Sequence, residues 1–268
     1  MSWQTTGNAD WTPTVTLNQA VGRFSKTLKV NLVQSPAIGS GAIINDEIVR
    51  IDGVDLINGI ITVGRGCADT LPTLHPIGSS LRFFQNAIEG DGREYLAGET
   101  IDVRLLARTS QQMLDPLQAP IEHLTFSARQ AKPYLPGNIR LNDELYPLVA
   151  EPAEEYILTW SHRDRQLQAD RLIDYLESSI GPELGVNYVI TIVKLDTQES
   201  VWTETVSVET LVLPYSSELS SENAIHSVTI KSIRDDITSM NQWVIELPEG
   251  HYVNEPPTEP EQPEGIVS

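Results

Sequence analysis

Short runs of alternating apolar and polar residues, separated by glycine, proline and asparagine, constrain this sequence more than any other feature. Before residue 110, no segment with helical periodicity extends beyond two turns. Leu28, Val30 and Leu32 alternate with Lys29 and Asn31, which is the period of a half-buried strand. Similar runs occupy residues 48–53, 81–84 and 101–105. We therefore predict that residues 1–110 form an all-β domain of barrel-like or sandwich-like type.

One dipeptide in this half indicates a specific turn. Asn58-Gly59 lies between the apolar runs 54–57 and 60–63. Both residue types accept a positive φ, which the two central positions of a type I′ turn require. The sequence therefore predicts a β-hairpin with a two-residue turn at Asn58 and Gly59.

The C-terminal half is also rich in strand patterns. Tyr156, Leu158 and Trp160 share one face of a predicted strand. Further runs follow at 187–195, 203–213, 228–231 and 243–247. Five or six strands over about a hundred residues are typical of a β-sandwich, so we predict one over residues 148–253, with Trp160 in its core. The spacing of Leu172, Ile173 and Leu176 allows one short helical turn.

Proline density separates the two halves. Four prolines lie between residues 115 and 138, and prolines at this density break regular structure and stiffen the chain. We predict a connector over residues 111–147, with room for one short strand at 121–126. Residues 254–268 contain four prolines and four glutamates. They cannot bury enough apolar surface to become ordered and are predicted to form a flexible acidic tail.

Charge is distributed unevenly along the chain. The sequence has 18 basic and 37 acidic residues, a net charge of −19. Residues 1–110 carry 9 basic and 11 acidic residues, whereas residues 148–253 carry 6 and 18. Such an acidic surface repels nucleic acid, and the step in charge supports two domains. We expect a chain without a membrane span and without a secretory signal, soluble where it is made.

The residue types of enzyme active sites do not form a recognisable pattern. Cys67 is the lone cysteine, and the five histidines are scattered, so neither a disulfide framework nor a zinc cluster is indicated. His162-Arg163-Asp164 lacks the residues that follow this triplet in protein kinases. We interpret it as a structural cluster in which Asp164 accepts from Arg163 or Arg165. We expect no enzyme activity, no cofactor and no metal site.

Three stretches carry a family resemblance. Residues 44–52 and 61–78 resemble the "R-G-x-x-D-T-x-P-x-x-H-x-x-G" segment of tailed-bacteriophage tail proteins and gene-transfer-agent hub proteins. Residues 129–142 resemble the connector of that family, and 158–165 with 180–188 resemble the fibronectin type III-like module that follows it. The resemblance places Arg65, Asp69 and His75 at motif positions. Their expected role is structural, with an ion pair between Arg65 and Asp69 across a tight turn.

The resemblance implies a structural component of a phage tail, at the tip, in the hub or in an adaptor ring. Expected partners are the tail tube, hub and fibre proteins together with further copies of the chain, as a ring or trimer. The expected location is the virion, after synthesis in the host cytoplasm. We expect contacts between copies within residues 1–147, because the acidic half repels itself. Two alternatives stay open: a module that attaches to host-surface glycans, and a cell-wall hydrolase.

Overall fold

The computed structural model describes residues 14–32, 34–84, 92–168, 170–218 and 223–253. Within these residues the chain is all-β, and its one helical element is a 3₁₀ turn, η1 (Arg129–Ala131). The predicted fold class is therefore confirmed. The chain divides into two compact units, which we call the N-unit (1–135, 164–177 and 233–241) and the C-unit (136–163, 178–232 and 242–268). The predicted acidic tail, 254–268, lies outside the described residues.

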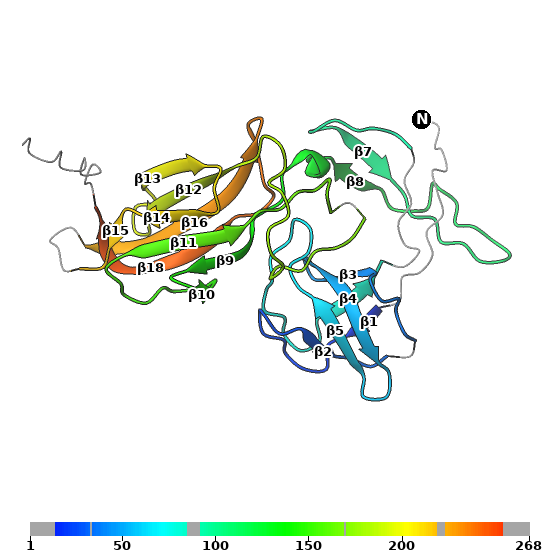
Figure 1. Cartoon of the computed structure of the whole chain (residues 1–268). Helices are drawn as coiled ribbons and strands as arrows, with labels where there is room; N and C mark the ends of the chain where they lie inside the picture. The colour runs from blue at the N-terminus through cyan, green and yellow to red at the C-terminus, as the bar shows by residue number, and fades with distance from the viewer. Residues whose placement is uncertain (1–13, 33, 85–91, 169, 219–222, 254–268) are drawn as a thin grey trace, which may run out of the picture. The chain divides into compact units, whose positions relative to one another are not determined.

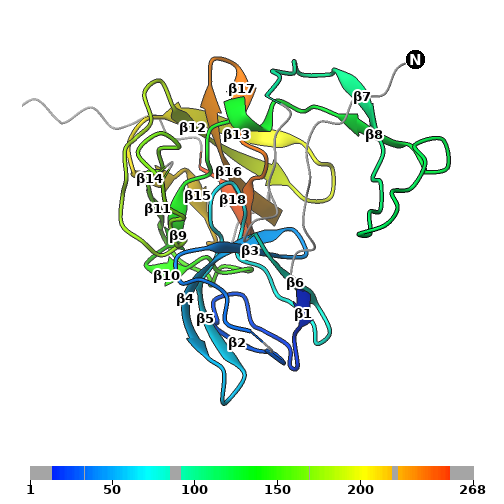
Figure 2. The same ribbon diagram turned by 90° about the vertical axis from the view of Figure 1, so that its right-hand side faces the viewer.

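Six antiparallel strands of the N-unit form a closed barrel (Figures 1 and 2). In spatial order they are β1 (Thr14–Thr16), β6 (Ser80–Phe83), β3 (Gly41–Ile44), β4 (Glu47–Asp55), β5 (Ile60–Gly64) and β2 (Thr27–Lys29). The two outer strands meet through an antiparallel bridge between Leu17 and Val30, and the Asn18 N–H donates to the Lys29 carbonyl at 2.7 Å. These two contacts close the sheet at the ends of β1 and β2.

Alternation along the strands places the apolar residues inside the barrel. Leu28, Val49, Ile51 and Leu81 are fully buried, and their neighbours in sequence face outward. The core therefore follows the pattern expected from the sequence, because successive side chains of a strand point to opposite sides.

The predicted hairpin forms, but its turn is different. Asp55 pairs with Ile60, so the loop has four residues, and of its residues only Gly59 has a positive φ (63°). The Asp55 carboxylate accepts from the backbone N–H groups of Ile57 and Asn58. This local cap competes with a type I′ turn, so the prediction of a two-residue turn was wrong. A Cβ at Gly59 would lie 2.4 Å from the Val30 carbonyl oxygen, so the position requires glycine.

Two strands of the N-unit form a separate ribbon. β7 (Thr100–Val103) pairs with β8 (Glu122–Thr125) and with no other described strand (Figures 1 and 2). Tyr95 and Phe126 stack at its base, with ring centroids 4.2 Å apart. The alternation at 101–105 predicted the first of these strands. The short strand predicted at 121–126 is confirmed.

The C-unit is a β-sandwich of two antiparallel sheets (Figure 1). One sheet has the order β10 (Glu144–Leu145), β9 (Gly137–Leu141), β11 (Tyr156–Ser161), β14 (Thr210–Leu213). The other has the order β13 (Ser200–Val206), β12 (Asn187–Lys194), β16 (Ala224–Arg234), β18 (Trp243–Tyr252), β15 (Tyr215–Ser216). β17 (Ile237–Thr238) pairs with Ile233 and Arg234 at the end of β16, and these residues belong to the N-unit. Apart from the two-residue strands, the described part of the C-unit has seven strands. In chain order, the first, second and fifth (β9, β11 and β14) lie in one sheet, and the other four (β12, β13, β16 and β18) lie in the other. This distribution is fibronectin type III-like.

The sandwich core is aromatic. Trp160 is 4% exposed, and its ring meets that of Tyr188 edge to face at a centroid distance of 5.4 Å. Tyr156 and Leu158 are buried on the same face of β11, as predicted. The run at 203–213 was expected to be one strand. It instead gives β13 and β14 in different sheets, because a turn over 207–209 lies between them.

The unit borders differ from the predicted ones. Residues 137–145, expected in the connector, form β9 and β10 of the sandwich. Residues 164–177, expected in the sandwich, belong to the N-unit. The short helical turn predicted from Leu172, Ile173 and Leu176 is a non-helical turn in the structure, where the Glu177 N–H donates to the Asp174 carbonyl at 3.1 Å. Ile173, Asp174 and Tyr175 are all buried, and the Tyr175 N–H donates to the Arg65 carbonyl of the barrel at 2.8 Å.

Candidate functional site

A buried ion pair lies beneath the motif of residues 65–78. Glu47 comes from the start of β4 and Arg65 directly follows β5, and both side chains are at most 2% exposed. The guanidinium binds the carboxylate in a bidentate manner, with Nε–Oε1 at 2.7 Å and Nη2–Oε2 at 2.9 Å. The remaining N–H groups donate to three carbonyls, those of Gly22, Ser25 and Thr73. Every guanidinium donor is thus used, which is what burial of a charge requires.

His75 completes this network in one tautomer. Its side chain is fully buried, and Nε2 lies 2.8 Å from Glu47 Oε2. Asn45 donates from Nδ2 to His75 Nδ1 at 3.2 Å. Because an amide nitrogen is a donor, Nδ1 is the acceptor and Nε2 carries the proton that it donates to Glu47. We call Glu47, Arg65, His75 and Asn45 the barrel network.

The electrostatics of the barrel network favour the ionised carboxylate. Burial by itself raises the pKa of Glu47, but hydrogen bonds from Arg65 and His75 and the charge of Arg65 outweigh it, so the pKa lies below the usual 4.5. Burial raises the pKa of the nearby Cys67 thiol to about 12. Burial therefore favours the protonated thiol at neutral pH.

The sequence predicted an ion pair between Arg65 and Asp69, and this pair does not form. Arg65 is occupied by Glu47, and Asp69 instead binds Arg129 in a bidentate manner, with Nε–Oδ2 at 2.5 Å and Nη2–Oδ1 at 2.6 Å. The hydrogen bonds to Asp69 raise the pKa of Arg129. The predicted cross-turn pair was wrong because a positive φ at Gly66 (53°) and the acidic residue at position 47 direct Arg65 into the barrel. The Asp69–Arg129 pair joins two of the three stretches that carry the family resemblance.

Residues 164–177 add a second carboxylate beside Arg65, which accepts from its backbone. Asp174 is 1% exposed, and its Oδ2 accepts from the Arg65 N–H at 2.8 Å and from Lys26 Nζ at 3.0 Å. Arg50 donates to the Leu172 carbonyl at 2.6 Å and to Glu177 at 2.7 Å. Sequence reasoning missed Glu47 and Asp174. A glutamate at an inward position of β4 was a readable signal for Glu47, but nothing local marks Asp174.

The triplet His162-Arg163-Asp164 is buried at the end of β11. His162 Nδ1 lies 2.7 Å from the Tyr188 hydroxyl, and burial lowers the pKa of the imidazole below 6.5. Arg163 donates to the carbonyls of His162 and Ser178. The Asp164 carboxylate accepts from the N–H groups of Gln166 and Leu167, which is an Asx turn. These contacts hold backbone in place.

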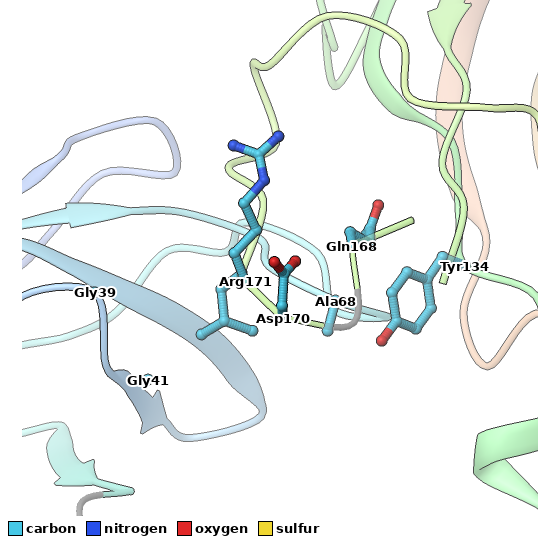
Figure 3. Close-up of a pocket in the computed structure, with 8 residues that line it drawn as sticks. Gly39, Gly41, Ala68, Tyr134, Gln168, Asp170 and Arg171 are labelled. Atoms are coloured by element: carbon cyan, nitrogen blue, oxygen red, sulfur yellow. The ribbon is translucent and has the colours of Figure 1, made fainter. Parts of the chain in front are cut away.

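A shallow pocket of about 230 Å³ lies in the N-unit (Figure 3). Its walls include Tyr134, Gln168, Asp170 and Arg171. Gln168 is 5% exposed, and its Oε1 has no hydrogen-bond partner among the described residues. A buried amide oxygen without a partner favours a ligand or water that donates to it.

The described residues contain no cluster of three or more His, Cys, Asp or Glu side chains that could hold a metal ion. Nor does any helix in this described part of the chain have the length and hydropathy to cross a membrane. Within it, Arg65, Asp69, His75, Trp160, Arg163 and Asp164 are all buried. The geometry of these residues suits a structural role.

Comparisons with known proteins add little to this geometry. No family model matches the sequence, and no curated protein matches it. Among solved structures, the chain is similar to the FN1–FN3 domains of chicken CNTN1, with 11% sequence identity and a TM-score of 0.26. The alignment covers 87% of this chain and 62% of that one. The fold assignment therefore rests on the strand order of the chain itself.

Proposed function

We propose that this chain is a structural component of a bacteriophage tail, in the tip, the hub or an adaptor ring, and that it acts by assembling with other proteins. It is not an enzyme. The proposal rests on the order of the three stretches that resemble tail and gene-transfer-agent hub proteins. Within the N-unit, residues of the first two stretches bind each other through Asp69 and Arg129.

The chemistry of the motif supports an architectural role. The guanidinium of Arg65 and the imidazole of His75 donate to Glu47 and to backbone carbonyls, so these two groups are not free to act on a substrate. The motif thus specifies how the barrel is built. An architectural component needs such a rigid frame, whereas a catalytic site needs groups free to react.

Labelling whole particles tests this proposal. A tag placed at the C-terminus, in the virus or prophage genome that encodes the chain, should be detected by electron microscopy at one end of the tail. Deletion of the gene should give particles with incomplete tails. The proposal is refuted if particles from the tagged genome contain no tag and particles from the deletion are intact and infective.

The pocket of the N-unit favours a second candidate, attachment to a host-surface glycan. Sugars bind by stacking on an aromatic ring while carboxylate, guanidinium and amide groups bond their hydroxyls. Among the residues that line the pocket, Tyr134 supplies an aromatic ring, Asp170 a carboxylate and Arg171 a guanidinium. Glycan-array binding by the full chain that is lost in Tyr134→Ala, but kept in Tyr95→Ala, would support it. An empty array would exclude it.

A further inference from the structure

The segment from 92 to 127, which we call the arm, has ordered backbone without a core of its own. Its ladder continues past β7 and β8 through a bridge between Arg108 and Met113. Of its 36 residues, Ala119 is the one that is fully buried. Ordering a residue costs about 1–2 kcal/mol of conformational entropy, and an isolated two-stranded ribbon is at best marginally stable. The arm therefore needs a surface from outside itself.

The arm exposes large apolar side chains of its own. Six of them are between 41% and 79% exposed: Leu96, Leu105, Met113, Leu117, Ile121 and Leu124. They offer roughly 400 Å² of apolar surface if a fully exposed side chain of this size gives on the order of 100 Å². A stable interface buries about 800 Å² per partner, somewhat more than half of it apolar. The arm alone thus carries most of the apolar area that one side of such an interface needs.

The base of the arm is held in place. Arg129, two residues beyond its end, binds Asp69 of the barrel motif through two hydrogen bonds. This pair fixes where the arm leaves the motif. Within the arm, Arg104 donates to the Pro116 carbonyl, and the apolar side chains of the arm stay exposed.

Charge and exposed surface point to a second copy as the partner. The C-unit carries 4 basic and 18 acidic residues, so C-units of two copies repel each other, whereas the N-unit carries 14 and 19. The barrel of the N-unit also exposes apolar side chains that its own arm leaves uncovered: Ile38, Leu56, Ile57, Leu74 and Ile77. The arm of one copy can therefore contact the barrel of another, either reciprocally in a two-fold dimer or head to tail, and a head-to-tail contact closes into a ring when its rotation closes.

We propose that the arm of one copy docks on the barrel of a second copy and is the main contact between copies. This inference deepens the proposed tail function and rests on it for its biological setting. Self-association of the purified chain, however, is measured without any virus. A chain that associates through the arm but is absent from virions would keep this proposal and refute the tail function.

The test uses the full-length chain in sedimentation velocity over a range of concentrations. The unmodified chain should self-associate, and the variant Leu105→Ser with Leu117→Ser should associate at least tenfold more weakly. Leu184→Ser with Val208→Ser is the matched control, because these side chains are 93% and 53% exposed in the C-unit. The control should associate as the unmodified chain does, and circular dichroism should show all three chains equally folded.

A photo-crosslinker at position 117 identifies the surface that the arm contacts. In a mixture of isotopically light and heavy chains, crosslinks should join light to heavy and fall on N-unit peptides of the other copy. Three results would overturn the proposal: a monomeric chain at all concentrations, equal association of the arm variant, or crosslinks confined to the C-unit. A monomer would mean that the arm binds a different protein.

Discussion

The barrel of the N-unit encloses a carboxylate, a guanidinium and an imidazole, whereas the sandwich of the C-unit encloses Trp160, Tyr188 and other aromatic rings. Both are antiparallel and both have fully buried apolar residues. Removing one member of a buried ion pair leaves the other charge buried without a partner, which lowers the free energy of unfolding by about 3–5 kcal/mol. Removing a ring leaves a cavity. The same fold class is thus stabilised by directional contacts in one unit and by packing in the other.

The sequence provides a separate reporter for each unit. Cys67 is the lone cysteine and is fully buried in the N-unit, so its reaction with a thiol reagent reports opening of the barrel. Trp160, Trp202 and Trp243 belong to the C-unit. In a background with Trp3→Phe and Trp11→Phe, tryptophan fluorescence therefore reports on the sandwich. All predictions below use these two readouts in urea.

Loss of Arg65 should have the largest effect. Arg65→Met leaves Glu47 charged and buried without its partner, so we expect the barrel to lose about 3–5 kcal/mol, toward the upper end of this range. Cys67 should react at a lower urea concentration, and the fluorescence midpoint of the sandwich should not move. Arg82→Met, an exposed position on β6, is the control and should change stability by less than about 0.5 kcal/mol. Equal effects of the two substitutions would contradict the contrast between the units.

Trp160→Ala should destabilise the sandwich by about 3–5 kcal/mol, toward the lower end. The indole N–H has no hydrogen-bond partner among the described residues, so only packing is lost. The fluorescence midpoint from Trp202 and Trp243 should fall, while Cys67 reactivity stays the same. The control is Trp202→Ala on the edge strand β13, where the half-buried ring leaves a smaller cavity. An unchanged midpoint for Trp160→Ala would show that Trp160 is not part of the core.

Acid should weaken the two units in different pH ranges. Burial lowers the folded-state pKa of His162 and His226, so the unfolded chain binds more protons and the sandwich loses stability as the pH falls below about 6.5. The folded-state pKa of Glu47 is also lowered, so the barrel keeps this contribution above about 4.5 and loses it below. Urea midpoints at pH 7.5, 5.5 and 4 should show the sandwich responding first. A barrel that weakens between pH 7.5 and 5.5 would contradict this order.

Leu117→Ser in the arm should have the smallest effect. The side chain is 79% exposed, so we expect both urea midpoints to change by less than about 0.5 kcal/mol. At a concentration low enough for the unmodified chain to be monomeric, limited proteolysis should cut first within residues 92–127, because this segment has almost no buried residues. A first cut within residues 187–213 of the sandwich would mean that the arm is protected.

Local alternation was sufficient to identify most strands. Leu28, Val49, Leu81, Tyr156 and Trp243 are all buried on the faces expected, because a strand repeats every two residues whatever its partners are. The hairpin at 58–59 was also found, but its turn type was not, since the Asp55 side chain decided it. A division at residue 147, which the sequence suggested, would remove Asp174 from the barrel that it supports.

By itself, the sequence determined the fold class, most of the strands, the sandwich tryptophan and the segregation of acidic charge, since each depends on nearest neighbours or on composition. The tertiary structure decided which charges meet. Arg65 and Asp69 are four residues apart, yet Arg65 binds Glu47 and Asp69 binds Arg129. Strand pairing brings Glu47 beside Arg65 and aligns their side chains, and no local pattern encodes that register. Closure of the barrel likewise joins Leu17 to Val30 through a bridge that depends on the whole sheet.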